Sequence, residues 1–158
     1  MSIQVGDQLP SFDLQEGTPG TTHNTAELFA GKKAVVFAVP GAFTPGCSKV
    51  HLPGYLADAD ALRAKGVDLI ACISVNDAFV MSAWGEAQGV DGKVLMLADP
   101  DASYTKAIGL DVEAGALGGT RSKRYSMLVE DGVVTKLNVE PDGFGISCST
   151  AVSILETL

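Results

Sequence analysis

The stretch PGAFTPGC at residues 40–47 directly follows KAVVFAV at residues 33–39. A near-continuous apolar run such as the second one is typical of a strand that is covered on both faces. Pro45 suits the first turn of a helix, where a missing backbone N–H does no harm. The two stretches together predict a buried strand, a turn, and a helix that begins close to Cys47. In open α/β sheets, functional sites lie beyond the carboxyl ends of such strands.

Cys47 is the residue in this stretch whose chemistry stands out. The start of a helix offers unpaired N–H groups and a partial positive charge, and both favour the thiolate, which is the reactive form of cysteine. Thr44 places a hydroxyl three residues earlier. Taken alone, the residues also allow plainer interpretations: a buried Cys47 that acts as a small apolar residue, a Thr44 that only caps the helix, and a Pro40 that only ends the strand.

The remaining chain alternates between predicted strands and helices. We expect an irregular lead-in over residues 1–30, with a short hairpin around 17–20. The predicted helices span residues 48–65, 78–88, 100–108 and 149–158, and the predicted strands span 67–75 and 94–97. We also expect a flexible loop at 115–119 and a hairpin of strands 126–129 and 133–138 around Asp131-Gly132. Asn76 or Asp77 is the expected cap of the second helix. This order predicts an α/β fold, a central mixed β-sheet layered by helices with a largely parallel centre, in a single domain spanning residues 1–158.

Composition narrows the functional classes. Apolar residues make up 46% and charged residues 19% of the 158 residues, which is ordinary for a globular protein. The net charge of −8 argues against nucleic-acid or anionic membrane partners. No apolar run approaches the roughly 20 residues of a membrane span, and no signal peptide is visible, so we expect a cytoplasmic location. Cys47, Cys72 and Cys148 lack the paired short spacings of a zinc site, and no pattern requires a metal or another cofactor.

The run PGAFTPGCSKVHLPGY at residues 40–55 resembles the active-site segment of the peroxiredoxins, and more narrowly that of the type-II branch, which includes the animal atypical two-cysteine enzymes. The resemblance covers nearly the whole chain, through the blocks GDQLP (6–10), ISVNDAFV (73–80), LADP (97–100), KRYSM (123–127) and LNVEP (137–141). Several such blocks in family order are far more specific than one short motif. The resemblance implies a thioredoxin-like fold with the peroxiredoxin N-terminal extension.

The resemblance also implies a function and a set of site residues. It implies a thiol-dependent peroxidase that reduces hydrogen peroxide and alkyl hydroperoxides through a Cys47 sulfenic acid. Thr44 and Arg124 would stabilise the developing negative charge, and Pro40 would shield the sulfur. Cys148 would resolve the sulfenic acid, and thioredoxin would recycle the enzyme, which is expected to form a homodimer.

Several assignments stay open at this stage. Arg121 is the rival of Arg124, and Lys123 a weaker one. His51 shares a helix face with Cys47 and could tune the thiolate or act as a base, although a packing or hydrogen-bonding role is favoured. Some type-II members, notably in plants, use a cysteine at the position of Cys72 for resolution, whereas the apolar strand around Cys72 favours core packing. Cys148 lies in a glycine-rich segment that looks mobile.

Two other functions compete with the leading one. The first is a one-cysteine peroxidase that is recycled by glutathione and glutaredoxin. The second is a redox sensor or holdase whose cysteine reports oxidation without turnover. A thioredoxin-type disulfide reductase is disfavoured, because no C-x-x-C motif is present.

Overall fold

A computed structural model describes residues 2–158. A seven-stranded sheet in the order β2-β1-β5-β4-β3-β8-β9 forms its centre. The strands are β1 (Asp13–Glu16), β2 (Thr18–Asn24), β3 (Lys33–Val39), β4 (Leu69–Ser74), β5 (Leu95–Ala98), β8 (Tyr125–Glu130) and β9 (Val133–Val139). Strands β3, β4 and β5 are parallel, whereas β1, β8 and β9 pair antiparallel with their neighbours. The predicted mixed sheet with a parallel centre is confirmed.

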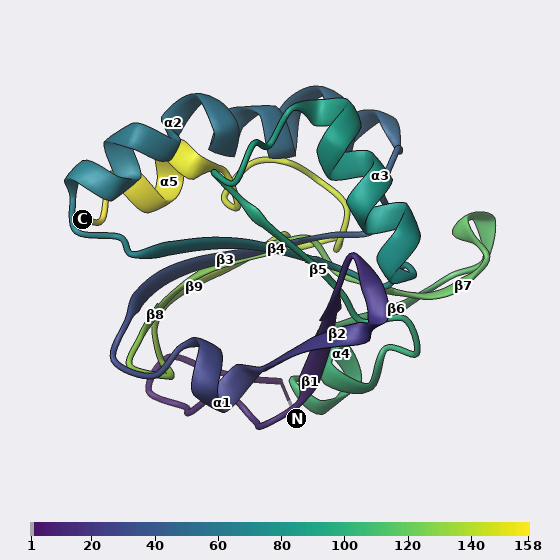
Figure 1. Cartoon of the computed structure of the whole chain (residues 1–158), viewed down its shortest axis with the longest axis horizontal. Coiled ribbons are helices and arrows are strands. Elements are labelled where there is room, and N and C mark those ends of the chain that lie inside the picture. Colours follow the sequence, from purple (N-terminus) through teal and green to yellow (C-terminus); the bar gives the residue numbers. More distant parts are fainter. Residues whose placement is uncertain (1) are drawn as a thin grey trace.

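Helices cover both faces of this sheet (Figure 1). On one face lie α2 (Leu52–Ala64), α3 (Ala78–Gln88) and α5 (Ala151–Leu155), and on the other lie α1 (Thr25–Leu28) and α4 (Ser103–Ala107). Side chains of a strand alternate between faces, so β3 supplies both halves of the core. Phe37 points toward the layer of α2, where Trp84 is also buried, and Val36 points toward the layer of α4. No helix in residues 2–158 is long and apolar enough to cross a membrane.

The segment after Cys47 departs from the single regular helix expected at residues 48–65. The chain is helical from residue 45, but Cys47–His51 forms a π-helical turn, η1, in which the Leu52 N–H bonds to the Cys47 carbonyl. Regular α-helical geometry begins only with α2. Pro53 explains the difference, because it has no N–H to donate and its ring would press on the carbonyl four residues earlier in a regular helix. The wider turn relieves that conflict.

The loop predicted at residues 115–119 is present, but the strands on either side of it were not predicted. A second, two-stranded sheet of β6 (Asp111–Ala114) and β7 (Gly119–Ser122) is present, connected by a short 3₁₀ turn, η2 (Gly115–Leu117). Gly118 and Gly119 have φ angles of 96° and 127°, a region that glycine reaches without strain, and this lets the chain reverse there. The glycines of this loop serve a tight reversal of the chain.

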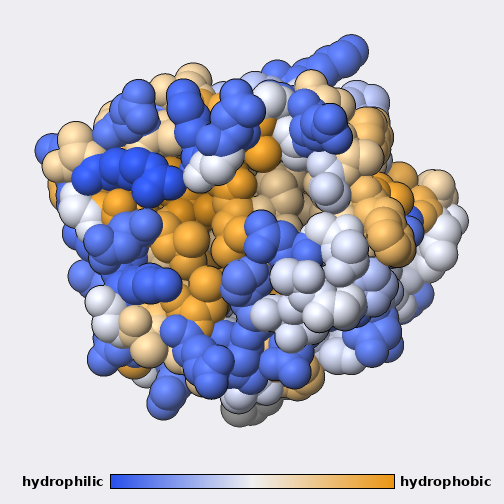
Figure 2. All heavy atoms as spheres, in the orientation of Figure 1, coloured by the Kyte–Doolittle hydropathy of each residue, from blue (hydrophilic) through white to orange (hydrophobic). Residues whose placement is uncertain are grey.

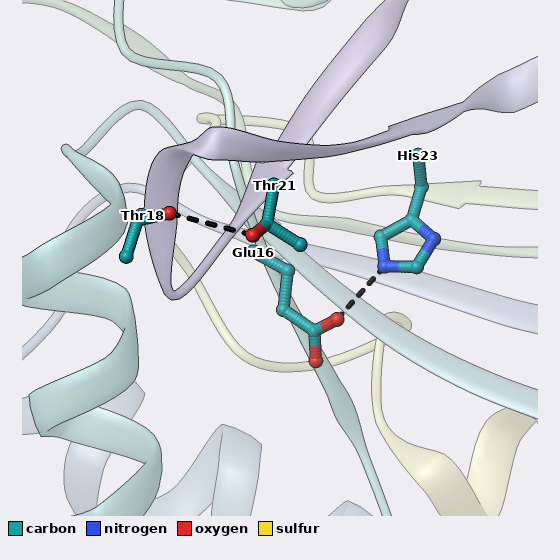
Figure 3. A network of polar contacts seen from close by, with 4 residues as sticks. All are labelled: Glu16, Thr18, Thr21 and His23. Carbon is teal, nitrogen blue, oxygen red and sulfur yellow. Dashed lines mark hydrogen bonds and ion pairs between the residues drawn. The ribbon is translucent and has the colours of Figure 1, made fainter.

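The expected hairpin near residues 17–20 is confirmed by the pairing of β1 with β2. Figure 3 shows Glu16 and His23 facing each other across this hairpin, with 2.8 Å between Glu16 Oε1 and His23 Nε2. Thr18 and Thr21 share a weaker hydrogen bond of 3.4 Å beside them. Both side chains are partly exposed, so this contact adds little to stability.

The helix at residues 78–88 and the hairpin of β8 and β9 lie where they were expected. Figure 2 shows that apolar side chains gather on the face seen in Figure 1, below α2. A groove of about 530 Å³ is lined in part by Arg63, Leu69, Ile70, Val90, Leu95 and Met96. It shares no lining residue with the surroundings of Cys47 described next.

Candidate functional site

Three strand ends meet at one edge of the sheet and build the site. Strand β3 ends just before the buried Pro40, and Ala38 of β3 pairs with Tyr125 at the start of β8. Tyr125 in turn pairs with Val139 at the end of β9. Arg124 and Glu140, the residues next to this pair, therefore lie at the same edge as Pro40. The edge also receives the start of the helical segment that carries Cys47.

Cys47 and Arg124 are in direct contact inside the protein. Cys47 is fully buried and Arg124 is 4% exposed, with 3.2 Å between Arg124 Nη2 and Cys47 Sγ. The rival Arg121 donates instead to the carbonyls of Val75 and Leu117. The geometry thus places Arg124, and not Arg121, at the sulfur. A guanidinium is charged at every physiological pH, so a permanent cation adjoins Cys47.

His51 links Arg124 to the C-terminal segment. Its Nδ1 lies 3.0 Å from Arg124 Nη1, and its Nε2 lies 2.9 Å from the Ser149 carbonyl oxygen. Arginine can only donate, so Nδ1 accepts, and Nε2 carries the proton and donates to Ser149. Burial, aided by the nearby Arg124 charge, lowers the pKa of His51 to about 4. The ring is therefore a neutral hydrogen-bonding group, and neither of its nitrogens is free to act as a base.

The Thr44 side chain is hydrogen-bonded within its own turn. Its hydroxyl donates to the Gly41 carbonyl at 2.7 Å and closes the turn before the helix. The Thr44 carbonyl accepts from the Ser48 N–H, so its backbone rather than its side chain begins the helix. Phe43, within the same turn, has a φ of 64° and is largely exposed.

The other two cysteines differ sharply from each other. Cys72 is buried in β4 within the same apolar cluster as Cys47, and burial, with a smaller effect of Cys47, raises the pKa of its thiol well above the ordinary value. Cys148 is only partly buried, and burial followed by the charge of Glu140 raises the pKa of its thiol. All three thiols are free.

The segment around Cys148, whose glycine-rich sequence looks mobile, is tied to Glu140 by hydrogen bonds. The Glu140 carboxylate is 1% exposed and accepts from the N–H groups of Ser147, Cys148 and Ser149. It also accepts from the hydroxyls of Ser147 and Ser149, each at 2.6 Å. Burial is the largest single effect on Glu140 and opposes its ionisation, but the hydrogen bonds from the two serines together outweigh it and lower its pKa to about 2.

Two residues of this network, Glu140 and Tyr55, were given no role from the sequence, although they lie in the family blocks at 137–141 and 40–55. The Tyr55 hydroxyl donates to the Ser149 carbonyl at 2.8 Å, and its ring stacks on Phe37 with 3.9 Å between centroids. Tyr55 follows His51 by four residues, a helical spacing that could have pointed to it. Apart from its family block, Glu140 had a weak signal, an acidic residue at a strand end followed by two serines on either side of a cysteine.

The arrangement suits thiol chemistry. Residues 2–158 hold no cluster of three or more His, Cys, Asp or Glu side chains that could bind a metal ion. A buried cysteine lies in the first turn of a helix, beyond the end of a parallel strand, with a guanidinium at its sulfur. Fold and site together define a thiol-based redox protein of the thioredoxin-like class.

Comparisons with known proteins narrow that class. The redoxin family profile matches residues 4–155. Peroxiredoxin-2E-2, chloroplastic, of Oryza sativa subsp. japonica is 49% identical over 99% of this chain and 73% of its own length. Peroxiredoxin-2B of Arabidopsis thaliana is 42% identical over 99% of this chain and 98% of its own length. The crystal structure of reduced Prx3 in complex with H₂O₂ from Vibrio vulnificus is 56% identical, with a TM-score of 0.93 and 99% of each chain covered.

The chain therefore belongs to the peroxiredoxin family, in its type-II branch, and is a thiol-dependent peroxidase. Its fold is thioredoxin-like, as the resemblance of residues 40–55 implied.

Proposed function

We propose that Cys47 is the residue that attacks the peroxide and that Arg124 stabilises the charge that develops in this step. The 3.2 Å contact between Arg124 Nη2 and Cys47 Sγ carries this assignment. The thiolate sulfur attacks one peroxide oxygen, an S–O bond forms and the O–O bond breaks. The departing oxygen takes up a proton and leaves as water or an alcohol. A fixed cation beside the breaking bond stabilises the negative charge on that oxygen.

Thr44 and Pro40 complete the assignment. Because the single hydroxyl proton of Thr44 is used on Gly41, its oxygen is left to accept a hydrogen bond from a peroxide O–H. The buried Pro40 ends β3 next to the site and keeps water from the sulfur. Both residues are already positioned around the reacting atoms, so they affect the rate of the peroxide reaction more than the stability of the fold.

Cys148 is the proposed resolving residue, with thioredoxin as the reductant. Its sulfur attacks the Cys47 sulfenic acid, a disulfide forms and water leaves. Two thiols of the reductant then restore both cysteines by disulfide exchange. Both cysteines are free thiols here, and we propose that the Cys148 segment moves toward Cys47 to form the disulfide. Glutathione with glutaredoxin is the alternative reductant, favoured if the anchored Cys148 segment cannot reach Cys47.

A homodimer is the proposed assembly. Phe43, Phe79 and Phe144 are 56%, 60% and 40% exposed. Ala42 bonds to Asn76, and Arg124 bonds to the Phe144 carbonyl, so all three aromatic rings come from segments tied to the site. Sedimentation of Phe79→Arg against the unchanged protein tests this, with a monomer expected only in the variant. The cytoplasmic location stays a prediction of the sequence, to be tested by cell fractionation.

The central test is Cys47→Ser in a peroxide-consumption assay with thioredoxin, thioredoxin reductase and NADPH. We expect the variant to fold and to consume no peroxide, because the attacking sulfur is gone. Peptide mass spectrometry of the unchanged protein after one equivalent of peroxide identifies the oxidised sulfur. Sustained consumption by Cys47→Ser would overturn the assignment, and consumption limited to one equivalent per chain in the unchanged protein would favour a redox sensor.

A further inference from the structure

Glu140 is an unusual group for the interior of a protein. It is 1% exposed, yet among residues 2–158 no cation forms an ion pair with it. Five neutral donors from residues 147–149 satisfy its carboxylate instead. Burying a charge without an opposite charge is unfavourable unless hydrogen bonds replace the lost water. The carboxylate and the 147–149 backbone therefore hold each other in place.

This anchoring fixes the direction of one carbonyl. The N–H groups of three consecutive residues converge on Glu140, and the Ser149 carbonyl accepts on its own side from His51 Nε2 and the Tyr55 hydroxyl, at 2.9 and 2.8 Å. His51 in turn accepts from Arg124, whose other terminal nitrogen touches the Cys47 sulfur. An unbroken chain of contacts thus runs from Glu140 to Cys47.

The same segment also holds the rest of Arg124. The Arg124 Nε donates to the Phe144 carbonyl at 3.1 Å, and its backbone N–H donates to the Gly143 carbonyl at 2.7 Å. The Glu140 N–H donates to the Arg124 carbonyl at 3.0 Å. Figure 1 shows this part of the chain, in yellow, passing between the helical layer and the sheet before α5. The orientation of Arg124 therefore depends on where the Cys148 segment lies.

We propose that Glu140 is a positioning residue, whose carboxylate anchors the Cys148 segment while Cys47 meets peroxide and thereby keeps Arg124 aimed at the Cys47 sulfur. The proposal rests on the proposed roles of Cys47 and Cys148. These hydrogen bonds hold the backbone of residues 147–149 and oppose movement of Cys148 toward Cys47, so Glu140 also delays disulfide formation. Its removal then has opposite effects on the two steps.

The first experiment needs no peroxide. With Cys47 and Cys72 replaced by serine, Cys148 is the single thiol. Its alkylation by monobromobimane, measured across pH and compared at full ionisation of the thiol, reports how firmly the segment is held. Glu140→Gln removes the charge and places amide donors against N–H donors. We expect alkylation to become faster by about tenfold, the change that corresponds to one lost hydrogen bond to a charged group.

Asp142→Asn is the matched control in the same background. Asp142 accepts from the N–H groups of Phe144 and Gly145 at the exposed start of this segment, but it does not bond to residues 147–149. Its substitution should leave the alkylation rate of Cys148 unchanged. Equal acceleration by both substitutions would show that any loosening of the segment suffices, and would overturn the specific role of Glu140.

The second experiment measures the peroxide step by stopped flow in the chain with all three cysteines. Glu140→Gln should slow oxidation of Cys47 by about tenfold, because Arg124 loses its support. Glu140→Asp keeps the charge and should recover part of the rate. The double variant Ser147→Ala/Ser149→Ala removes the two hydroxyl donors and leaves the carboxylate in place. If Glu140→Gln does not fold, this variant tests whether the anchoring of the segment supports Arg124.

A lower melting temperature with unchanged alkylation and oxidation rates would reduce Glu140 to a structural residue and overturn the proposal. If the unchanged protein oxidised another sulfur than Cys47, the proposed function would fail, while the alkylation comparison would still report whether Glu140 anchors the segment. The two failures are thus distinguishable.

Discussion

Cys47 and Cys148 have opposite electrostatic surroundings. Cys47 is fully buried in a helical turn with a guanidinium 3.2 Å from its sulfur. Cys148 lies partly exposed in a loop beside a buried carboxylate, and burial together with that carboxylate raises the pKa of its thiol. A cation adjoins the first sulfur and an anion the second.

The difference shows how two thiols in one chain can be kept for different steps. A thiol whose pKa is raised above its ordinary value stays protonated at neutral pH, and a protonated thiol is a poor nucleophile. Cys148 is therefore less reactive while it stays beside Glu140 than it would be away from it. Movement of its segment toward Cys47 would also take it away from the carboxylate, so position and reactivity would change together.

The strongest way to break this comparison is Cys148→Ser. We expect one oxidation of Cys47 per chain, followed by loss of thioredoxin-linked turnover and accumulation of sulfinic acid at Cys47, because no internal thiol captures the sulfenic acid. A coupled NADPH assay and peptide mass spectrometry measure both. Cys72→Ser, the control, should keep turnover. A Cys47–Cys72 disulfide, or full turnover in Cys148→Ser, would transfer the resolving role away from Cys148.

The cation at Cys47 is tested next. Arg124→Ala should slow oxidation of Cys47 by about 10²–10³, the usual effect of removing one group that stabilises a developing oxyanion. Stopped-flow measurement of the first oxidation gives the rate. Arg121→Ala is the matched control, since Arg121 bonds only to carbonyls away from the sulfur. A larger loss in Arg121→Ala would contradict the choice of Arg124.

The pH dependence of stability sharpens the account of His51. Its pKa is about 4 in the folded protein, whereas the ordinary histidine pKa of 6.5 applies to the unfolded chain, so the unfolded chain binds the proton first as the pH falls. The stability that depends on a neutral His51 is complete above pH 6.5 and is lost between 6.5 and about 4, by about 3 kcal/mol at most.

Urea unfolding of the unchanged protein and of His51→Gln across that window measures this loss. The stability of the variant should be nearly flat where that of the unchanged protein falls. Glu140 has a pKa of about 2 in the folded protein and an ordinary pKa of 4.5 in the unfolded chain. The stability that depends on its charge is therefore complete above pH 4.5 and is lost below it. The pH ranges in which His51 and Glu140 change stability thus barely overlap. Identical slopes in both proteins between pH 4 and 6.5 would show that His51 does not titrate as described.

The smallest effect concerns Gly46. A methyl group there would lie 3.2 Å from Ile146 Cδ1 and 3.3 Å from Arg124 Nη2. Gly46→Ala therefore crowds both the guanidinium at Cys47 and the segment that carries Cys148. The control Gly54→Ala, in α2, meets nothing within 4 Å and should stabilise the fold by about 0.4–1 kcal/mol. Gly46→Ala should be about 1 kcal/mol less stable than this control, as is usual for overpacking. Equal melting temperatures of the two variants would show that Arg124 and Ile146 can yield freely.

Much of the fold could be predicted because its signals are local. The apolar run of β3, the Asp77 cap of α3 and the Asp131-Gly132 turn each act within a few residues. The π-helical turn escaped prediction because the missing N–H of Pro53 shows its effect only once the helix around it has formed. The β6–β7 hairpin escaped because its strands are short and its glycines favour a loop.

The site was predictable in its residue types but not in its connections. Family blocks point to Cys47 and Arg124, and the structure places them in contact. The bond from His51 to the Ser149 carbonyl spans 98 residues of chain, and no local pattern encodes it. Neutral donors satisfy the charge of Glu140, and such donors leave no charge pattern in the sequence that could have paired the residue with its segment.

The π-helical turn at Cys47–His51 makes the length of this segment as important as its composition. A turn of this kind holds one residue more than a regular helical turn over about the same rotation. Deletion of a single exposed residue such as Lys49 would remove that extra residue and leave Cys47 close to its present direction. It would, however, press the Pro53 ring against the carbonyl of the preceding turn, so we expect the deletion to lower stability. In descendants of this chain, single-residue deletions should therefore be rarer here than substitutions.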